Sequence, residues 1–235
     1  MDIAVIGLGS MGKRRIRLIK EMYPEYNLLG VDGREDRRNE ASKLFNIQCF
    51  SALIQVNEHI DCVFICTSPL SHNALIHDAL LKDCHVFTEL NLVADGYEEN
   101  VRLSREKVKK LFLSSTFFYR EEIKYICNKV KGGKWNYIYH IGQYLPDWHP
   151  WESYKDFFLV DKRTNGCREI MAIELPWLTG AFGDVVDAKV SGDKMTELFI
   201  DYKDNYIIQL THENGNKGCL IVDVVSPVAV RKLEI

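Results

Sequence analysis

Short apolar runs alternate with polar, helix-like segments through the first half of the chain. The apolar runs lie at residues 3–6, 28–31, 47–50, 60–66, 85–88 and 111–115. Near-continuous runs with β-branched members, such as 60–66, are typical of central parallel strands that are covered on both faces. Asp95 and Glu98 have the spacing of a capping box and predict the start of a helix. The repeated alternation of strand and helix predicts a doubly wound parallel sheet within residues 1–117.

The pattern changes after residue 117. Helices are expected at 118–130 and 168–182, and strands at 135–144, 188–190, 196–202, 206–211, 218–224 and 228–235. Asn214-Gly215-Asn216 is a hairpin signal between two of these strands. The fold class is therefore α/β, and the second domain, over 118–235, is expected to be an α+β domain with antiparallel strands. Because the chain stops at Ile235 inside an apolar run, this second domain is expected to be short or truncated.

The first apolar run leads into a glycine-rich turn, Gly7-x-Gly9-x-x-Gly12, and then into an amphipathic helix. In such a unit Gly7 turns the chain, Gly9 lets a pyrophosphate approach the backbone, and Gly12 lets the helix pack on the strand. Ser10 and Met11 open the helix, whose free N–H groups and partial positive charge bind an anion. These features predict a Rossmann dinucleotide-binding site.

Asp32 ends the second apolar run, twenty residues after Gly12, where a carboxylate meets the adenosine ribose hydroxyls. Arg34 could stack on adenine or bind a 2′-phosphate, but Asp32 would repel that phosphate. NAD is therefore the expected cofactor, and NADP stays possible.

Turns that follow later strands belong to the same crevice, because ligands of open α/β sheets bind outside the carboxyl ends of the strands. The candidates for cofactor contact in these turns are Thr67, Ser68, Pro69, His72 and Glu89. His72 also fits the alternative of an ordinary residue in the first turn of a helix, since a lone histidine is weak support for a site.

Composition narrows the choice of function. The 235 residues are 46% hydrophobic and 27% charged with a net charge of −3, which gives no general attraction to nucleic acid or to an anionic membrane. The basic cluster Lys13-Arg14-Arg15 with Arg17 is expected to be a solvated helix face that could also help to hold phosphate. Seven cysteines without a CxxC pair are expected to be reduced, and no metal site is predicted. Without a signal-peptide pattern or a membrane-length apolar run, we expect a cytoplasmic protein.

Several motifs together resemble the Gfo/Idh/MocA oxidoreductases. They are the glycine turn with Asp32, Thr67-Ser68-Pro69-x-x-His72, His85-Val86-Phe87-x-Glu89, and Tyr119-Arg120 at the opening of the second domain. The resemblance implies a Rossmann domain followed by an α/β domain with an open, mostly antiparallel sheet. It also implies NAD(P)-dependent oxidation or reduction of a sugar, sugar nucleotide, cyclitol or related hydroxyl compound. The stretch 144–157 is similar to a subgroup linked with bacterial surface-sugar biosynthesis.

Two positions depart from the family's catalytic pattern. The family's strand-end motif is Glu-Lys-Pro, whose lysine helps to relay a proton, whereas this chain has Glu89-Leu90-Asn91. The family also places an acid–base histidine on the helix of the second domain, near the position of Ile173. Loss of a positioned acid–base group costs about 10²–10⁴-fold in rate. The candidate substitutes are Glu174, His149 and Glu169, which lie on that helix or in the aromatic loop 144–152.

The catalytic candidates also have structural alternatives. Glu174 is the first choice, because its apolar neighbours could raise its pKa, and it would otherwise be the buried partner of an arginine. His149 would otherwise pack among the aromatic side chains of its loop, with Trp148 and Trp151 at a domain interface.

Two functions stay open. The intact dinucleotide motif fits an NAD(P)-dependent oxidoreductase acting on a sugar-like substrate. It also fits a dinucleotide-binding protein that has lost turnover and acts as a sensor or assembly partner, which Leu90 and Ile173 favour. In either case we expect a homodimer or larger assembly through the strands of the second domain, since an unpaired strand edge invites pairing.

Overall fold

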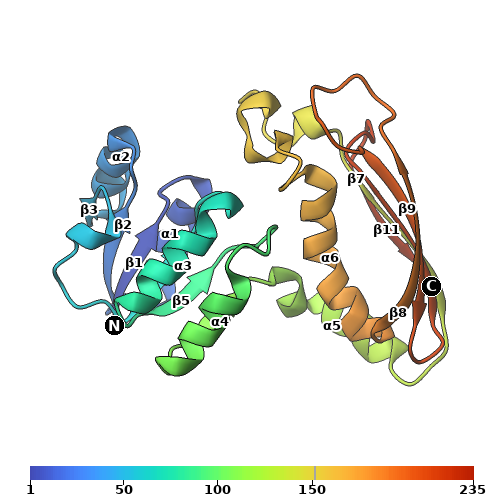
Figure 1. Ribbon diagram of the computed structural model, residues 1–235, viewed down its shortest axis with the longest axis horizontal. Coiled ribbons are helices and arrows are strands. Elements are labelled where there is room, and N and C mark those ends of the chain that lie inside the picture. Colours follow the sequence, from blue (N-terminus) through green and yellow to red (C-terminus); the bar gives the residue numbers. More distant parts are fainter. Residues whose placement is uncertain (151) are drawn as a thin grey trace. The chain divides into compact units, whose positions relative to one another are not determined.

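The chain divides into two units in the computed structural model, which describes residues 1–150 and 152–235 (Figure 1). Unit 1 is Met1–Ser114 and unit 2 is Ser115–Ile235. This division falls slightly before the border expected at 117/118, because residues 116–119 form a short turn that belongs with unit 2. Trp151, expected at a domain interface, lies outside the described residues.

Unit 1 is a six-stranded sheet in the order β3-β2-β1-β4-β5-β6, and every neighbouring pair is parallel. Its strands are β1 (Asp2–Ile6), β2 (Asn27–Val31), β3 (Gln48–Phe50), β4 (Cys62–Ile65), β5 (His85–Thr88) and β6 (Leu111–Leu113). Its helices are α1 (Ser10–Met22), α2 (Glu35–Phe45), α3 (His72–Leu81) and α4 (Tyr97–Glu106). The doubly wound parallel sheet expected from the sequence is confirmed.

Two hydrophobic cores lie on opposite faces of this sheet. Ile3 and Val5 of β1 pack with α1 and α2 on one face, whereas Ala4 and Ile6 pack with α3 on the other. Both faces of β1 are buried, which explains its continuous apolar run. The strand order reverses between β1 and β4, and such a switch point opens a crevice at the carboxyl ends of the strands.

A helix begins between Asp95 and Glu98, as expected, but its N-cap residue is Gly96 and not Asp95. Gly96 has a left-handed φ of 60° and has no side chain with which to cap α4. A side chain at Gly96 would collide with Asn73, so the close approach of α3 sets the start of α4. That approach comes from a distant segment and is invisible to a local pattern.

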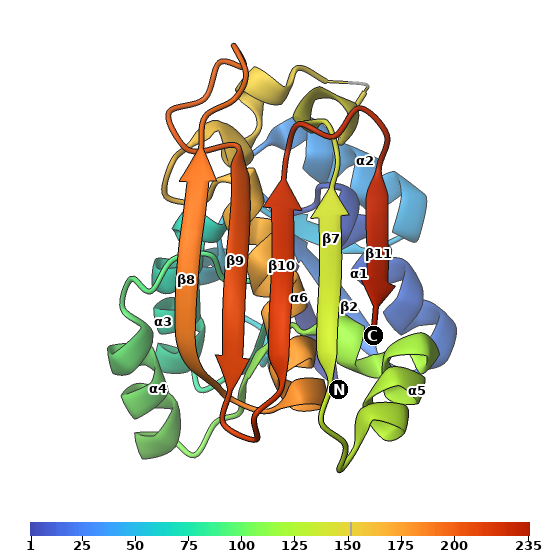
Figure 2. The ribbon, with the colours of Figure 1, turned by 90° about the vertical axis from the view of Figure 1, so that its right-hand side faces the viewer.

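Unit 2 is a mixed sheet in the order β11-β7-β10-β9-β8 with two helices (Figure 2). Its strands are β7 (Asn136–Gly142), β8 (Val185–Asp193), β9 (Asn205–His212), β10 (Lys217–Asp223) and β11 (Val230–Glu234), and its helices are α5 (Glu121–Val130) and α6 (Gly166–Phe182). Only the β7–β10 pair is parallel among these described strands. The hairpin at 214–216 is confirmed, with Gly215 at a φ of 87° between β9 and β10.

Helix α6 covers one face of this sheet. Trp177, Leu178 and Phe182 are fully buried and pack with strand residues such as Tyr139. Figure 2 shows the opposite face turned to the viewer, and no described helix of unit 2 crosses it. Alternation along β7 follows this arrangement, because Tyr137 and Tyr139 are buried while Ile138 is 48% exposed.

Two elements of unit 2 differ from expectation. Residues 196–202 form a loop and not a strand, since the buried Asp204 carboxylate accepts the backbone N–H groups of Met195 and Thr196 at 2.7 and 3.0 Å. These local bonds replace a strand ladder. The helix expected to begin at 118 begins at Glu121, after a 3-10 turn over Thr116–Tyr119.

Candidate functional site

In the glycine turn between β1 and α1 there is no space for a side chain at Gly7 or Gly12, whereas there is space at Gly9. Gly7 has a φ of 89°, and its N–H donates to the Val31 carbonyl at 2.8 Å. A Cβ at Gly12 would lie 1.8 Å from the Gly7 carbonyl oxygen, so this position needs glycine for folding. At Gly9 a Cβ would meet only the Arg37 guanidinium, at 3.6 Å, among the described residues. The backbone at Gly9 is therefore accessible to a ligand at the N-terminus of α1.

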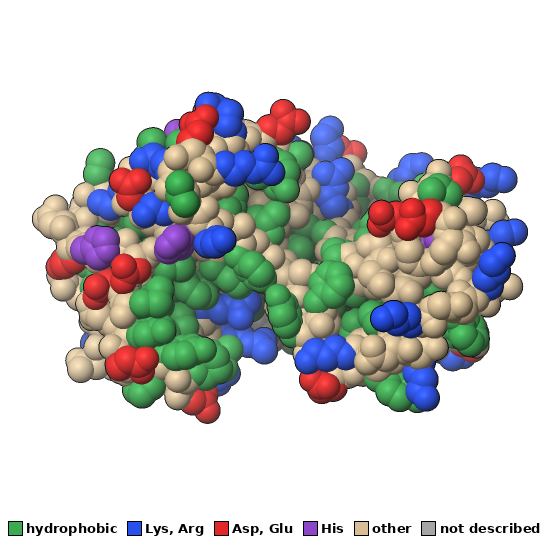
Figure 3. Space-filling model, turned by 90° about the horizontal axis from the view of Figure 1, so that it is seen from below, with side chains coloured by type: hydrophobic (Ala, Val, Ile, Leu, Met, Phe, Trp, Pro, Cys, Tyr) green, Lys and Arg blue, Asp and Glu red, His purple; other side chains and the backbone are tan. Residues whose placement is uncertain are grey.

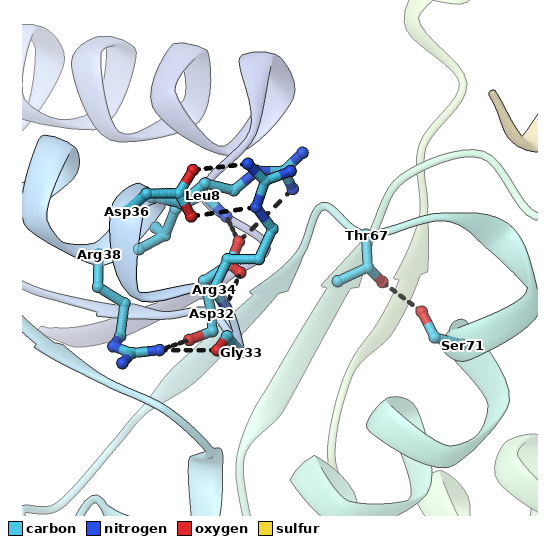
Figure 4. A network of polar contacts seen from close by, with 9 residues as sticks. Leu8, Asp32, Gly33, Arg34, Asp36, Arg38, Thr67 and Ser71 are labelled. Carbon is cyan, nitrogen blue, oxygen red and sulfur yellow. Dashed lines mark hydrogen bonds and ion pairs between the residues drawn. The ribbon is translucent and has the colours of Figure 1, made fainter. Parts of the chain in front are cut away.

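Asp32 joins the end of β2 to this turn (Figure 4). Its Oδ2 accepts the Leu8 N–H at 2.8 Å and its Oδ1 accepts the Arg34 N–H, also at 2.8 Å. The side chain is 9% exposed, and Arg37 Nη1 lies 3.8 Å from Oδ2. The carboxylate is thus held in one orientation, and its contact with the adenosine ribose stays a prediction.

Three arginines surround Asp32 and have different partners. Arg34 forms an ion pair with Asp36 at 2.6 Å and both are exposed, whereas Arg38 Nη1 donates to the carbonyl oxygens of Asp32 and Gly33 at 2.7 and 2.9 Å (Figure 4). Sequence reasoning singled out only Arg34 and missed Arg37 and Arg38. The available signal was the presence of three arginines within the six residues that follow Asp32.

His72 connects the turns that follow β4 and β5. It is 2% exposed, and its Nε2 lies 3.0 Å from the Thr67 carbonyl oxygen. Its Nδ1 faces Asn91 Oδ1 and also Thr88 Oγ1, the latter at 3.2 Å. The Ser71 hydroxyl in turn donates to Thr67 Oγ1 at 2.7 Å (Figure 4). His72 therefore holds the two turns together, and its direct contact with a cofactor stays a prediction, as do the contacts of Ser68 and Pro69.

Glu89 is paired with Arg15, which was expected on a solvated face. Arg15 Nε donates to Glu89 Oε1 at 2.6 Å, and the guanidinium lies 5.0 Å from the centre of the Phe87 ring. The Cys66 thiol lies 4.0 Å from the same carboxylate oxygen, and burial together with Glu89 raises its pKa to about 12. Cys66 is therefore a neutral thiol and does not serve as a nucleophile.

Glu174 lies between α6 and the sheet of unit 2. Its Oε2 accepts the Tyr139 hydroxyl at 2.8 Å and the Trp177 Nε1–H at 2.6 Å, while its Oε1 lies 2.9 Å from Arg231 Nη2. The side chain is 1% exposed. This is the arrangement of a buried partner for an arginine: Oε2 accepts two hydrogen bonds, and Oε1 has the ion pair with Arg231 but no hydrogen bond among the described residues.

Glu169 stands in a different environment on the same helix. It lies one turn after the glycine that opens α6 and is half-buried, and its buried Oε2 has no hydrogen-bond partner among the described residues. Burial raises the pKa of this carboxyl to about 7. Gly166 is required at the start of the helix because a Cβ there would lie 2.8 Å from Val224.

His149 packs in the aromatic loop before α6. Its Nδ1 lies 2.7 Å from Glu152 Oε1, and its ring centre lies 4.2 Å from that of Phe157. The structure thus brings the cofactor candidates to one sheet edge of unit 1, and it distributes the catalytic candidates over α6 and the loop that precedes it in unit 2.

Comparison with known families decides what unit 1 is. Residues 1–114 match the profile of Gfo/Idh/MocA, described as an oxidoreductase family with an NAD-binding Rossmann fold. Unit 1 belongs to the Gfo/Idh/MocA oxidoreductases. The match covers all of unit 1, and the family description agrees with the glycine turn and Asp32. A sequence comparison with curated proteins gave no match.

Solved structures of similar fold extend over both units. GenD2 from gentamicin A biosynthesis, in complex with NAD, is 15% identical with a TM-score of 0.84, and the alignment covers 99% of this chain and 68% of GenD2. The WlbA dehydrogenase from Bordetella pertussis, in complex with NADH and UDP-GlcNAcA, is 14% identical with a TM-score of 0.85, over 97% of this chain and 72% of WlbA. An oxidoreductase from Agrobacterium radiobacter, with NAD+, L-tartaric acid and magnesium, is 16% identical with a TM-score of 0.84, over 99% and 70%. At these identities the likeness shows the fold.

Other classes of site find no support in the described part of the chain. No group of three or more His, Cys, Asp or Glu side chains within 1–150 and 152–235 is placed to hold a metal ion. None of the helices described is long and apolar enough to span a bilayer. Both Lys or Arg and Asp or Glu side chains are scattered over the face drawn in Figure 3, with hydrophobic side chains between them.

Proposed function

We propose that this protein is an NAD-dependent oxidoreductase that acts on a hydroxyl or carbonyl group of a sugar, sugar nucleotide or cyclitol-like compound. The observation that carries the proposal is the open backbone at Gly9 beside the fixed Asp32 carboxylate, in a unit of an oxidoreductase family. When bound, NAD accepts or donates a hydride at its nicotinamide ring.

The residues of unit 1 fit this cofactor. The N–H groups at the start of α1 are available for the pyrophosphate, and Asp32 is available for the adenosine ribose hydroxyls. Thr67, Ser68 and Pro69 follow β4 at the same edge of the sheet. Because Arg34 forms an ion pair with Asp36, it is less suited to bind a 2′-phosphate.

We expect NADH to bind at least about tenfold more tightly than NADPH. A 2′-phosphate would meet the Asp32 carboxylate, which is turned inward by its two backbone N–H donors and adds a like charge. Fluorescence titration of the purified protein with both cofactors measures the ratio. Tighter binding of NADPH would contradict the assignment and make the arginines after Asp32 the readers of the phosphate.

Glu169 is the group that we propose as proton carrier. A hydroxyl that loses hydride must also lose a proton, and a carboxyl whose pKa is near 7 exchanges protons at neutral pH. Its Oε2, which has no hydrogen-bond partner within the part of the chain that the structure describes, is available to accept that proton. Glu174 would then hold α6 on the sheet, and His149 would order the loop before it.

The substrate class rests on relatives of similar fold and on the chemistry of unit 2. The WlbA structure contains UDP-GlcNAcA, and another relative is a UDP-N-acetylglucosamine 3-dehydrogenase. Aromatic side chains with a few polar groups, as in the loop that contains His149, suit the apolar faces and hydroxyls of a sugar. A turnover screen with UDP-sugars and cyclitols, followed by NADH absorbance, tests this. Cofactor binding without turnover of any substrate would instead fit the sensor hypothesis.

We also propose that copies of the chain associate through the open face of the unit 2 sheet. Ile138 and Ile207 on this face are 48% and 46% exposed, and Ile221 is cross-strand neighbour to Ile207. Contiguous exposed apolar surface on a sheet marks an interaction site.

Ile207→Lys is expected to shift the protein to monomer, because a charge would be buried in the interface. Light scattering at high micromolar concentration measures the mass. Ile54→Lys is the matched control, since Ile54 is an exposed isoleucine of unit 1 and its variant should keep the wild-type mass. A monomeric wild-type protein would rule out this association.

A further inference from the structure

The Arg15–Glu89 ion pair lies at the end of the crevice opposite Asp32. A dinucleotide bound across the switch point between β1 and β4 would have its adenosine half toward β2 and its nicotinamide half toward β4 and β5. Glu89 directly follows β5, and its N–H donates to the carbonyl of Ile65 at the end of β4, at 2.9 Å. The pair therefore stands on the nicotinamide side of the glycine turn.

The low exposure of the pair strengthens its electrostatic interactions. The side chains of Arg15 and Glu89 are only 17% and 14% exposed, and charges removed from water interact more strongly than charges on the surface. Phe87, under the guanidinium, is stacked between Phe64 and Phe112 with ring centres 4.7 and 5.6 Å apart. This aromatic row keeps Arg15 over β5 and beside Glu89.

The two redox forms of the cofactor differ by one charge at the ring. The oxidised nicotinamide carries a positive charge and the reduced one is neutral, so a nearby unpaired carboxylate stabilises the oxidised form selectively. Leu90 adds no charge after Glu89, and Arg15 neutralises the carboxylate. Removing either partner would leave a net charge of known sign beside the ring.

We propose, building on the cofactor site proposed above, that the Arg15–Glu89 pair sets the preference of this protein between NAD+ and NADH. Because the pair is neutral overall, it does not favour the positively charged NAD+ over the neutral NADH, as an unpaired carboxylate would. The pair acts on the equilibrium between the two bound forms, and it takes no part in proton transfer.

A charge cycle tests the proposal by calorimetric titration of each cofactor, without any substrate. Arg15→Met keeps an apolar stem over Phe87 and leaves Glu89 unpaired, so the ratio Kd(NADH)/Kd(NAD+) should rise about tenfold. Glu89→Gln leaves Arg15 unpaired, so the ratio should fall by about the same factor. The double variant should return to the wild-type ratio, and so should Arg15→Lys, which keeps the charge.

Arg17→Met is the matched control, because Arg17 is an exposed arginine of the same helix, and the ratio should not change. Ratios that stay within about threefold of wild type in both single variants would overturn the proposal, as would a shift of both in the same direction. Parallel weakening of both cofactors would also overturn it, since that outcome indicates a structural role only. If wild-type protein bound neither NAD+ nor NADH, the proposed function would fail, and this inference with it.

Discussion

Gly9→Val is expected to abolish binding of both NAD+ and NADH while the protein stays folded. The side chain would occupy the space where the pyrophosphate approaches the backbone. The fold should tolerate it, because the nearest described atoms belong to the flexible Arg37 guanidinium, which can move. Calorimetric titration measures the binding, and circular dichroism with thermal unfolding shows whether the fold is kept.

Gly12→Val is the contrasting variant. Its Cβ would lie 1.8 Å from the Gly7 carbonyl oxygen, so this change should lower the unfolding temperature as well as remove binding. If Gly9→Val loses binding at an unchanged unfolding temperature and Gly12→Val does not, glycine is needed at Gly9 for the ligand and at Gly12 for the fold. Normal NADH affinity in folded Gly9→Val would contradict the placement of the pyrophosphate.

Glu169→Gln is expected to lower kcat by about 10²–10⁴-fold and to leave the Kd of NADH unchanged. The pKa of Glu169, raised by burial to about 7, also fixes the sign of the pH dependence. In the oxidation direction the carboxylate is the base, so kcat/KM should rise as the pH increases through about 7. In the reduction direction the protonated acid is needed, and kcat/KM should fall over the same range. Both pH dependences should vanish in the variant.

Glu174→Gln is the matched control on the same helix. Arg231 would lose its anionic partner, and the hydrogen bonds from Tyr139 and Trp177 would weaken, so thermal stability should fall while the pH dependence near 7 is kept. If kcat instead fell in Glu174→Gln and not in Glu169→Gln, the proton carrier would be Glu174.

The parts of the fold that local patterns could predict are those fixed by neighbours in the sequence. The run from Ile3 to Ile6, the glycine turn and the hairpin at Gly215 each need particular residue types at adjacent positions. The Rossmann order and the site edge follow from them. The loop at 196–202 could not be predicted, because the strand-like sequence is held in a loop by the backbone hydrogen bonds that the Asp204 carboxylate accepts.

In the candidate site, too, some features can be predicted from nearby residues and others cannot. Asp32 is predictable by its distance from Gly12, but the ion-pair partners of Arg15 and Glu174, which are Glu89 and Arg231, lie 74 and 57 positions away in the sequence. Whether a carboxyl is engaged or left without a partner depends on such distant groups. Sequence alone therefore grouped Glu169 and Glu174 together. The structure separates them, because Glu174 is ion-paired with Arg231 and accepts two hydrogen bonds at Oε2, whereas Oε2 of Glu169 has no hydrogen-bond partner among the described residues.

The charged edges of the unit 2 sheet limit the kind of assembly that it can form. One edge is β8, which carries Asp187, Lys189 and Asp193, and the other is β11, which carries Arg231 and Lys232. Charged edge strands resist the addition of further strands, which is how open-ended growth into fibres begins. In the association that we propose, copies would meet through the open face of the sheet, and the charged edge strands would stay unpaired. Such an assembly would be closed and would not extend into filaments.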